Sequence, residues 1–174
     1  EPAFAAGLEW GRHELILIRE RVAVAVADST LNANELACLG YDDVHMIPAG
    51  VDPRRLTSIT PSLTTLDDLE ATMPDRFVVN VSQLLPHKRQ DVLIQALHIL
   101  QTIHAMDLGL VLVGTVRSQA YGRALEELGR RLRVRHLWFA GRQPDGALAT
   151  IYRRATVFAS ASMHEGLGIP PLEA

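Results

Sequence analysis

Two glutamates, Glu165 and Glu173, frame a short glycine-containing loop near the end of the sequence. An apolar run at Thr156–Ser160 precedes the loop and predicts a buried strand, and Pro171 suits the first turn of a helix. A loop between a strand and a helix N-terminus presents backbone N–H groups that can bind an anion. Because a carboxylate accepts hydrogen bonds from both hydroxyls of a diol, the two acids indicate a ligand with sugars around a phosphate, a nucleotide-sugar. Each acid by itself could equally stabilise the helix N-terminus or be solvated.

A second candidate site is the segment Ser82–Arg89, which contains His87, Lys88 and Arg89 in succession. These residues lie just before a predicted helix, where the helix dipole disfavours positive charge by a few tenths of a kcal/mol each. Cations are therefore unfavourable at this position unless an anion lies beside them, so the segment predicts a bound anion. The alternative is that Lys88 and Arg89 are solvated and that Asp91 compensates their charge.

From Phe77 onward, apolar runs and amphipathic stretches alternate along the chain. This alternation predicts an α/β fold, a parallel sheet with helices on both faces, and ligands bind such sheets beyond the carboxyl ends of the strands. Gly114 and Arg142 both follow predicted strands; Gly114 either lets a nucleotide approach or is a simple turn glycine. The predicted strands are 77–81, 108–113, 137–140 and 156–160, and the predicted helices are 91–104, 120–132 and 148–154.

The N-terminal third predicts a separate arrangement of short elements. A helix over 8–21 precedes a buried strand at 22–27, rich in β-branched residues. Ser29 is a candidate N-cap for a helix ending near Leu39, and 44–48 predicts another strand. The Ser-, Thr- and Pro-rich stretch that follows predicts a linker with one short helix at 66–73.

Three segments, in this order, resemble the retaining GT-B glycosyltransferases of family 4, also called group 1. Ile47–Asp52 is similar to the family's IPNGVD segment, with Ala49 in place of Asn. Ser82–Lys88 is similar to its G-R-x-x-P-x-K loop, with Ser and Gln in place of Gly and Arg. Glu165–Glu173 is similar to its E-x7-E motif, with Leu in place of the commoner Phe. The resemblance implies a Rossmann-like donor-binding domain.

The resemblance also implies a role for each matching residue. Lys88 would contact the donor diphosphate and Glu165 the donor sugar, and these two are the expected catalytic residues. Glu173 would contact the ribose. The acceptor attacks from the leaving-group face in this family, so no protein nucleophile is expected. The expected donor-binding residues are Ser82, Gln83, Lys88, Gly114, Arg142, Glu165, Gly166, Leu167, Gly168 and Glu173.

By the same resemblance, residues 1–47 would be the tail of an N-terminal acceptor domain, 48–75 the interdomain linker, and 76–174 a donor domain that lacks its C-terminal end. We therefore expect a piece of a larger protein, inactive alone, whose missing N-terminal domain binds a glycan, lipid or small-molecule acceptor. Retaining transfer of a hexose is the expected reaction, mannosyl transfer among its forms. A non-catalytic or degenerate nucleotide-sugar-binding module is the alternative, and a GT-B epimerase or phosphorylase is a third class.

Composition narrows the function classes further. The 174 residues carry a net charge of −3, which does not suggest a nucleic-acid partner. Cys38 is the only cysteine, so no internal disulfide can form. We therefore expect the protein in a reducing, cytoplasmic compartment, with at most a peripheral location at the inner membrane surface. No apolar run approaches the ~20 residues of a membrane span. The sequence has no Asp-x-Asp, P-loop or H-E-x-x-H motif, so we expect no cofactor and metal-independent chemistry.

Overall fold

The computed structural model describes residues 2–48, 50, 52, 54–163, 165 and 168–174. The chain divides into two compact units, Glu1–Gly50 and Val51–Ala174. Each unit has its own sheet.

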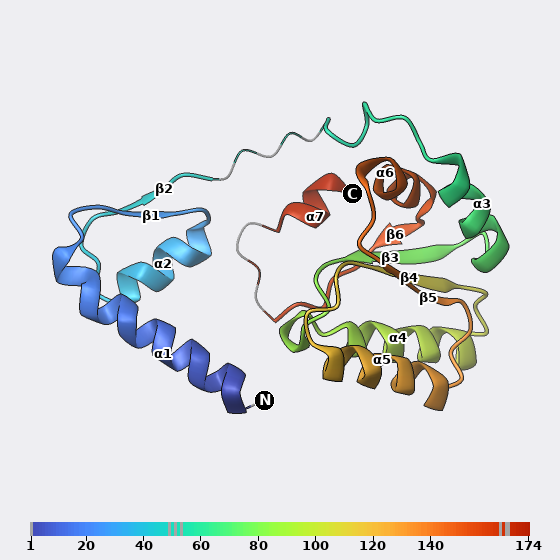
Figure 1. The fold of residues 1–174 in the computed structure, drawn as a ribbon, viewed down its shortest axis with the longest axis horizontal. Helices are drawn as coiled ribbons and strands as arrows, with labels where there is room; N and C mark the ends of the chain where they lie inside the picture. Colours follow the sequence, from blue (N-terminus) through green and yellow to red (C-terminus); the bar gives the residue numbers. More distant parts are fainter. Residues whose placement is uncertain (1, 49, 51, 53, 164, 166–167) are drawn as a thin grey trace. The chain divides into compact units, whose positions relative to one another are not determined.

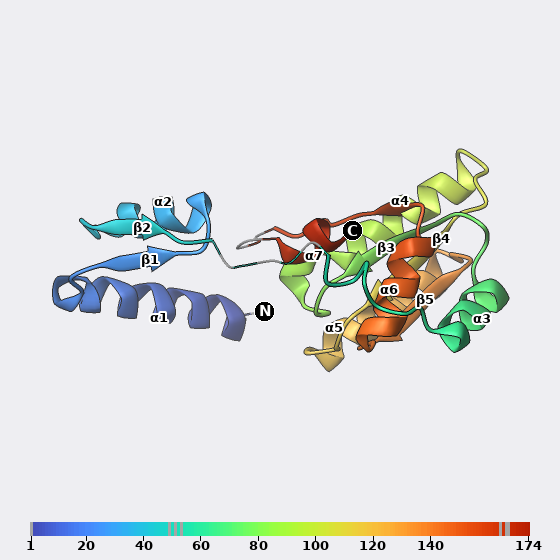
Figure 2. The ribbon, with the colours of Figure 1, turned by 90° about the horizontal axis from the view of Figure 1, so that it is seen from above.

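The first unit contains two helices and a two-stranded sheet. Strands β1 (Ala25–Ala27) and β2 (Val44–Met46) pair in parallel, with Ala25 opposite Val44. Figure 1 shows both helices on one side of these strands, and Figure 2 shows the strands side by side. Ser29 caps α2 as predicted, since its Oγ accepts from Asn32 N at 3.3 Å. The helical segments are α1 (Pro2–Ile18), η1 (Arg19–Arg21) and α2 (Thr30–Cys38).

The strand predicted at 22–27 has one buried and one exposed face in the described residues. Ala25 and Ala27 are buried, whereas Val24 and Val26 are 50% and 56% exposed. Successive side chains of a strand point to opposite faces, and within the described part of this unit the helices cover one face only. The alternation places the two alanines against the helices and the two valines on the face that the described helices leave uncovered.

The second unit has a four-stranded sheet of order β5-β4-β3-β6, in which every pairing is parallel. The four strands are β3 (Phe77–Val81), β4 (Gly109–Val113), β5 (Leu137–Gly141) and β6 (Val157–Phe158). The prediction of an α/β fold with a parallel sheet is confirmed. The helical segments are α3 (Leu63–Thr72), η2 (Pro86–Lys88), α4 (Gln90–Thr102), α5 (Gln119–Arg131), α6 (Asp145–Arg154) and α7 (Ile169–Glu173).

Each face of this sheet is covered by its own helices and its own apolar core. In Figure 1, α4 and α5 lie on one face, and α3, α6 and α7 lie on the other. Strand β4 contributes to both cores: Leu110 and Leu112 face α4 and α5, while Val111 and Val113 face α3 and α6. All five residues of β4 are buried, as expected for a central strand of a doubly covered sheet.

Strand β6 is shorter than predicted. The strand spans two residues, and Val157 is 52% exposed in the described residues. It pairs with β3 in parallel, Val157 opposite Val78 and Phe158 opposite Val79. The helix after the glutamate-framed loop also begins earlier than predicted, at Ile169, with a proline in its first turn, where the missing N–H costs nothing.

Candidate functional site

Two loops meet at the carboxyl ends of β3 and β6. Asn80 Nδ2 donates to the carbonyl oxygen of Ala159 at 2.8 Å, and Met163 N donates to the carbonyl oxygen of His87 at 2.8 Å. Beyond these bonds, Lys88 Nζ lies 2.8 Å from Glu165 Oε1. The structure thus brings together the two residues that the sequence predicted as catalytic, from loops 77 positions apart.

The Lys88–Glu165 ion pair is partly shielded from water. The Lys88 side chain is 17% exposed and the Glu165 side chain 37%. Burial alone would raise the pKa of Glu165, but hydrogen bonds from Lys88 and Ser162, with the positive charge of Lys88, outweigh burial and lower it. Glu165 is therefore ionised at neutral pH, and an anionic ligand at Lys88 must share that lysine with Glu165 or displace it.

Arg89 is directed to a different acid. Its guanidinium lies 3.1 Å from Asp91 Oδ2, and Tyr121 Oη donates to Asp91 Oδ1 at 3.0 Å. Burial would raise the pKa of Asp91, but the bonds from Arg89 and Tyr121 lower it. The positive charge of Arg89 is thus compensated by Asp91, whereas the positive charge of Lys88 is compensated by Glu165.

Ser82 and Gln83 help to fix the shape of the lysine loop. Ser82 Oγ donates to Asn80 Oδ1 at 2.8 Å and accepts from Gln90 Nε2 at 2.8 Å. The same Gln90 nitrogen donates to the carbonyl oxygen of Gln83 at 3.1 Å, and Gln90 is fully buried. The Gln83 side chain is exposed. A buried amide thus holds the backbone of this loop, while the side chain at position 83 carries no charge.

Gly114 allows two loop backbones to approach closely. It has a φ of +147°, and a Cβ at this position would lie 1.9 Å from the carbonyl oxygen of Ser82. The close approach in the structure is to the Ser82 loop, which is a packing reason for glycine. Arg142, after β5, is exposed.

Glu173, the second acid of the loop, is held by a residue that sequence reasoning did not single out. Arg55 Nη2 donates to Glu173 Oε1 at 2.7 Å, and Arg55 Nη1 donates to Asp145 Oδ2 at 2.6 Å. The Glu173 side chain is 10% exposed. Hydrogen bonds from the guanidinium to Glu173 and then Asp145 raise the pKa of Arg55. Both acids that frame the loop are therefore paired with cations from other segments.

The loop between these acids is described in part. Gly168 has φ +69° and ψ +50°, a left-handed conformation that favours glycine, and it is the N-cap of α7. Gly166 and Leu167, whose amides were predicted to bind sugar and pyrophosphate, lie outside the described residues. The described residues contain no group of three or more His, Cys, Asp or Glu placed to hold a metal ion. No helix in the described ranges is long and apolar enough to cross a membrane.

Comparison with known proteins identifies the family. The sequence profile described as "Glycosyl transferases group 1" matches residues 65–174, which is more than half of the chain. The chain belongs to this family. The predicted family is thereby confirmed, and the lysine loop and the E-x7-E segment both lie within the matched region.

Curated relatives of this group 1 chain include the serotype-specific mannosyltransferase WbdA of Escherichia coli. The two are 32% identical over 106 residues, which is 59% of this chain and 13% of WbdA. The chain therefore spans a small part of the length of that relative.

Several solved structures share the fold. HepE of Anabaena, crystallised with UDP and glucose, has a TM-score of 0.70 at 20% identity, over 89% of this chain and 42% of HepE. Sucrose-phosphate synthase of Thermosynechococcus elongatus has a TM-score of 0.72 at 20% identity, over 93% of this chain and 40% of the synthase. The C-terminal domain of LpcC from Francisella tularensis has a TM-score of 0.57 at 20% identity, over 72% of this chain and 65% of that domain. The group 1 chain thus has the fold of a C-terminal GT-B domain, as the sequence predicted.

Arg55 and Asp145 are among the residues at this site that the sequence did not reveal. Arg55 lies in the polar stretch predicted as a linker, and its partner Glu173 is 118 residues away. Asp145, just before Gly146, looks like an ordinary turn or helix-start residue. No local pattern distinguishes these side chains from solvated ones, since their pairing arises only when the linker segment, α6 and α7 are brought together.

Proposed function

We propose that Val51–Ala174 binds the nucleotide-diphosphate sugar donor of a retaining hexosyltransferase. The observation that carries the proposal is the 2.8 Å contact between Lys88 Nζ and Glu165 Oε1 at the carboxyl end of the sheet. This contact joins a cation suited to a diphosphate to an acid suited to sugar hydroxyls, which is the pairing that a sugar diphosphate needs.

Each residue has its own role in donor binding and bond breaking. The diphosphate takes Glu165's place on Lys88, and the released carboxylate accepts hydrogen bonds from hydroxyls of the hexose. As the bond between the anomeric carbon and the diphosphate oxygen breaks, negative charge grows on the leaving diphosphate, and Lys88 stabilises it. Glu173 accepts hydrogen bonds from the ribose diol. Arg142 and the Gly114 turn, which follow neighbouring strands, contribute the nucleoside side of the site.

The rest of the proposal concerns the whole protein. Residues 1–47 are the tail of an acceptor-binding domain and 48–75 the junction, so the chain alone transfers nothing. The fold shared with HepE makes UDP-sugars the first donors to test, and the similarity to WbdA adds donors that carry mannose. A single cysteine is compatible with a reducing, cytoplasmic setting. Metal-independent transfer to a glycan, lipid or small-molecule acceptor completes the proposed reaction.

Calorimetry tests the donor site directly. The chain is titrated with UDP, GDP and ADP, and then with the hexose derivative of the nucleotide that binds. We expect saturable binding of one nucleotide, weakened at least tenfold by Lys88→Ala, which removes a charge-assisted contact. Arg131→Ala, which removes an exposed arginine at the end of α5, is the matched control and should bind as the wild type does. Absence of heat with all three nucleotides would refute the donor site.

A degenerate, non-catalytic binding module is the second candidate. The observation that favours it is that Ser82 and Gln83 replace the Gly and Arg of the family's loop, and that the exposed Gln83 side chain supplies no cation. An assay of donor hydrolysis and transfer by the full-length protein separates the two functions. Turnover with retention of anomeric configuration supports the transferase, and tight donor binding without turnover supports the module.

A further inference from the structure

The linker arginine Arg55 connects two acids that are far apart in sequence. Its guanidinium nitrogens lie 2.6 Å from Asp145 Oδ2 and 2.7 Å from Glu173 Oε1. A guanidinium is a rigid planar fork with several N–H donors, so it can fix the distance and orientation between two carboxylates. Lysine, with a single mobile ammonium, can contact one of these acids but cannot fix both at once.

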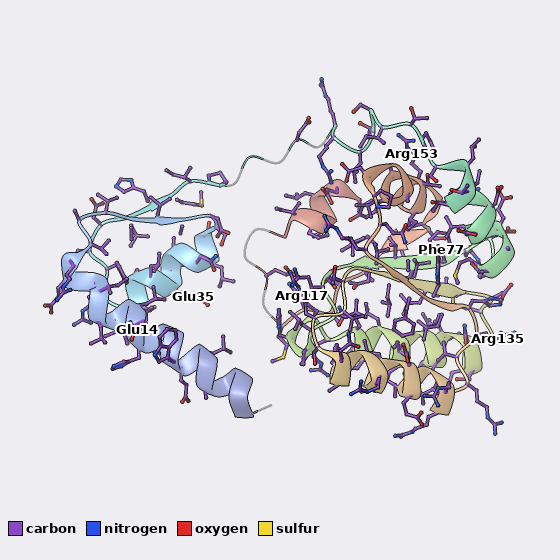
Figure 3. The ribbon with its side chains drawn as sticks, viewed as in Figure 1. Glu14, Glu35, Phe77, Arg117, Arg135 and Arg153 are labelled. Carbon is purple, nitrogen blue, oxygen red and sulfur yellow. The ribbon has the colours of Figure 1, made fainter. Side chains whose placement is uncertain are left out.

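The segment that carries Arg55 is firmly attached to the second unit. Leu56 is 5% exposed and belongs to the core on the α6 face. Arg153 of α6, labelled in Figure 3, donates from Nη2 to the carbonyl oxygens of Leu56, Thr57 and Ile59 at 3.2, 2.8 and 3.1 Å. Farther along, Ser62 N donates to Thr150 Oγ1 at 2.8 Å. Arg55 therefore projects from a fixed backbone rather than from a loose linker.

The Glu173 carboxylate is held by a residue outside its own helix, α7 (Ile169–Glu173). Tyr152 Oη donates to the carbonyl oxygen of Pro170 at 3.2 Å, which fixes the helix but not the Glu173 side chain. Arg55 is the residue that fixes the carboxylate. It occupies one oxygen, and an ionised carboxylate has about four acceptor positions, so the remainder can accept from a diol.

We propose that Arg55 is a positioning residue that holds the Glu173 carboxylate in the orientation that recognises the two hydroxyls of the donor ribose. This inference rests on the proposed donor site. Arg55 does not touch the donor; it acts through Glu173, and Asp145 serves only to hold the far side of the guanidinium. Recognition of the ribose thereby depends on the segment through which the chain enters the donor-binding unit.

The test measures how strongly each variant prefers a ribonucleotide. Dissociation constants are determined by calorimetry for the nucleoside diphosphate that the wild type binds and for its 2′-deoxy and 3′-deoxy analogues. We expect the wild type to prefer the ribonucleotide by about tenfold, the size expected for a hydrogen bond to a charged group. Arg55→Ala should reduce this preference to less than about twofold, as should Glu173→Gln, and the double variant should lose nothing more. Asp145→Asn, whose amide oxygen can still accept a hydrogen bond from Arg55, should keep more of the preference than Arg55→Ala does, and Arg55→Lys, which retains a cation beside Glu173, should restore part of it.

Each outcome bears on one of the two claims. A wild type that binds no nucleoside diphosphate overturns the donor site and, with it, this inference. A wild type that binds ribo and deoxy forms equally overturns the role of Glu173. If the wild type shows the preference and Arg55→Ala, folded by circular dichroism, keeps it, the inference alone is wrong. Should Arg55→Ala fail to fold, Arg55→Gln and Arg55→Lys decide: an unchanged preference in both overturns the proposal, and a loss in Gln with partial recovery in Lys supports it.

Discussion

Glu165→Gln should strengthen binding of a nucleoside diphosphate while weakening the additional contribution of the hexose. In the structure Lys88 is paired with Glu165 at 2.8 Å, so a diphosphate must compete with that carboxylate. Glutamine keeps the size of the side chain and removes its charge. Lys88 is then available to the diphosphate, but the acid that would accept hydrogen bonds from the sugar is lost.

The geometry of the pair sets the expected magnitude. At 2.8 Å and an effective dielectric constant of about 20, the gross Coulomb attraction is about 6 kcal/mol. With 17% and 37% of the two side chains exposed, most of this is offset by desolvation and lost side-chain entropy, and the net value is about 1 kcal/mol. Releasing Lys88 should therefore tighten nucleoside diphosphate binding by about fivefold.

Isothermal titration of four proteins tests the reasoning: wild type, Glu165→Gln, Lys88→Gln and the double variant. The gain from Glu165→Gln should vanish when Lys88 is already glutamine, because no cation remains to be released. A gain that persists in the Lys88→Gln background would instead reflect general repulsion between Glu165 and the phosphates. If Glu165→Gln is folded and binds the nucleoside diphosphate no more tightly than the wild type, competition between the acid and the diphosphate is refuted.

Two further predictions concern stability. Gly114→Ala should lower the free energy of unfolding, measured in urea, by more than about 3 kcal/mol, because its Cβ would lie 1.9 Å from the carbonyl oxygen of Ser82. Gly141→Ala, at φ +66° with open space around the new methyl group, should cost only about 1 kcal/mol, and equal losses would contradict the clash. Because the pKa of Glu165 is lowered below 4.5 by its partners, its stabilising contribution is present above that value and lost as pH falls through the lower folded pKa. The urea midpoints of wild type and Glu165→Gln should differ near neutral pH and converge in acid; a constant difference would contradict the linkage.

The alternation of strands and helices could be predicted from the sequence because it depends on local spacing. The repeated apolar runs after Phe77 place β3, β4 and β5 within a residue of their observed bounds. Ser29 was identified as an N-cap because the preference for a short polar side chain at a helix start is local. The length of β6 was not predictable in the same way, since it pairs with β3 through only two residues, and that pairing joins segments far apart in the chain.

The burial of polar residues was likewise not predictable from the sequence. Gln101 lies in α4 and is 9% exposed; its Nε2 donates to the carbonyl oxygens of Leu108 and Arg135, each at 2.8 Å. Glutamine in a helix ordinarily indicates a solvated face. Only the fold supplies the carbonyl groups that make burial of this amide favourable, so its position could not be inferred from its type.

The sequence by itself determined the fold class, the family and the acids and the lysine of the proposed donor site. Residue types and spacings a few positions apart carry this information, because helices, strands and turns respond to their nearest neighbours. The tertiary structure decided how those charges are paired: Lys88 with Glu165, Arg89 with Asp91, and Glu173 with Arg55. A carboxylate looks the same in a sequence whether it faces water, a ligand or a guanidinium, and its partner is set only when segments far apart in the chain are folded together.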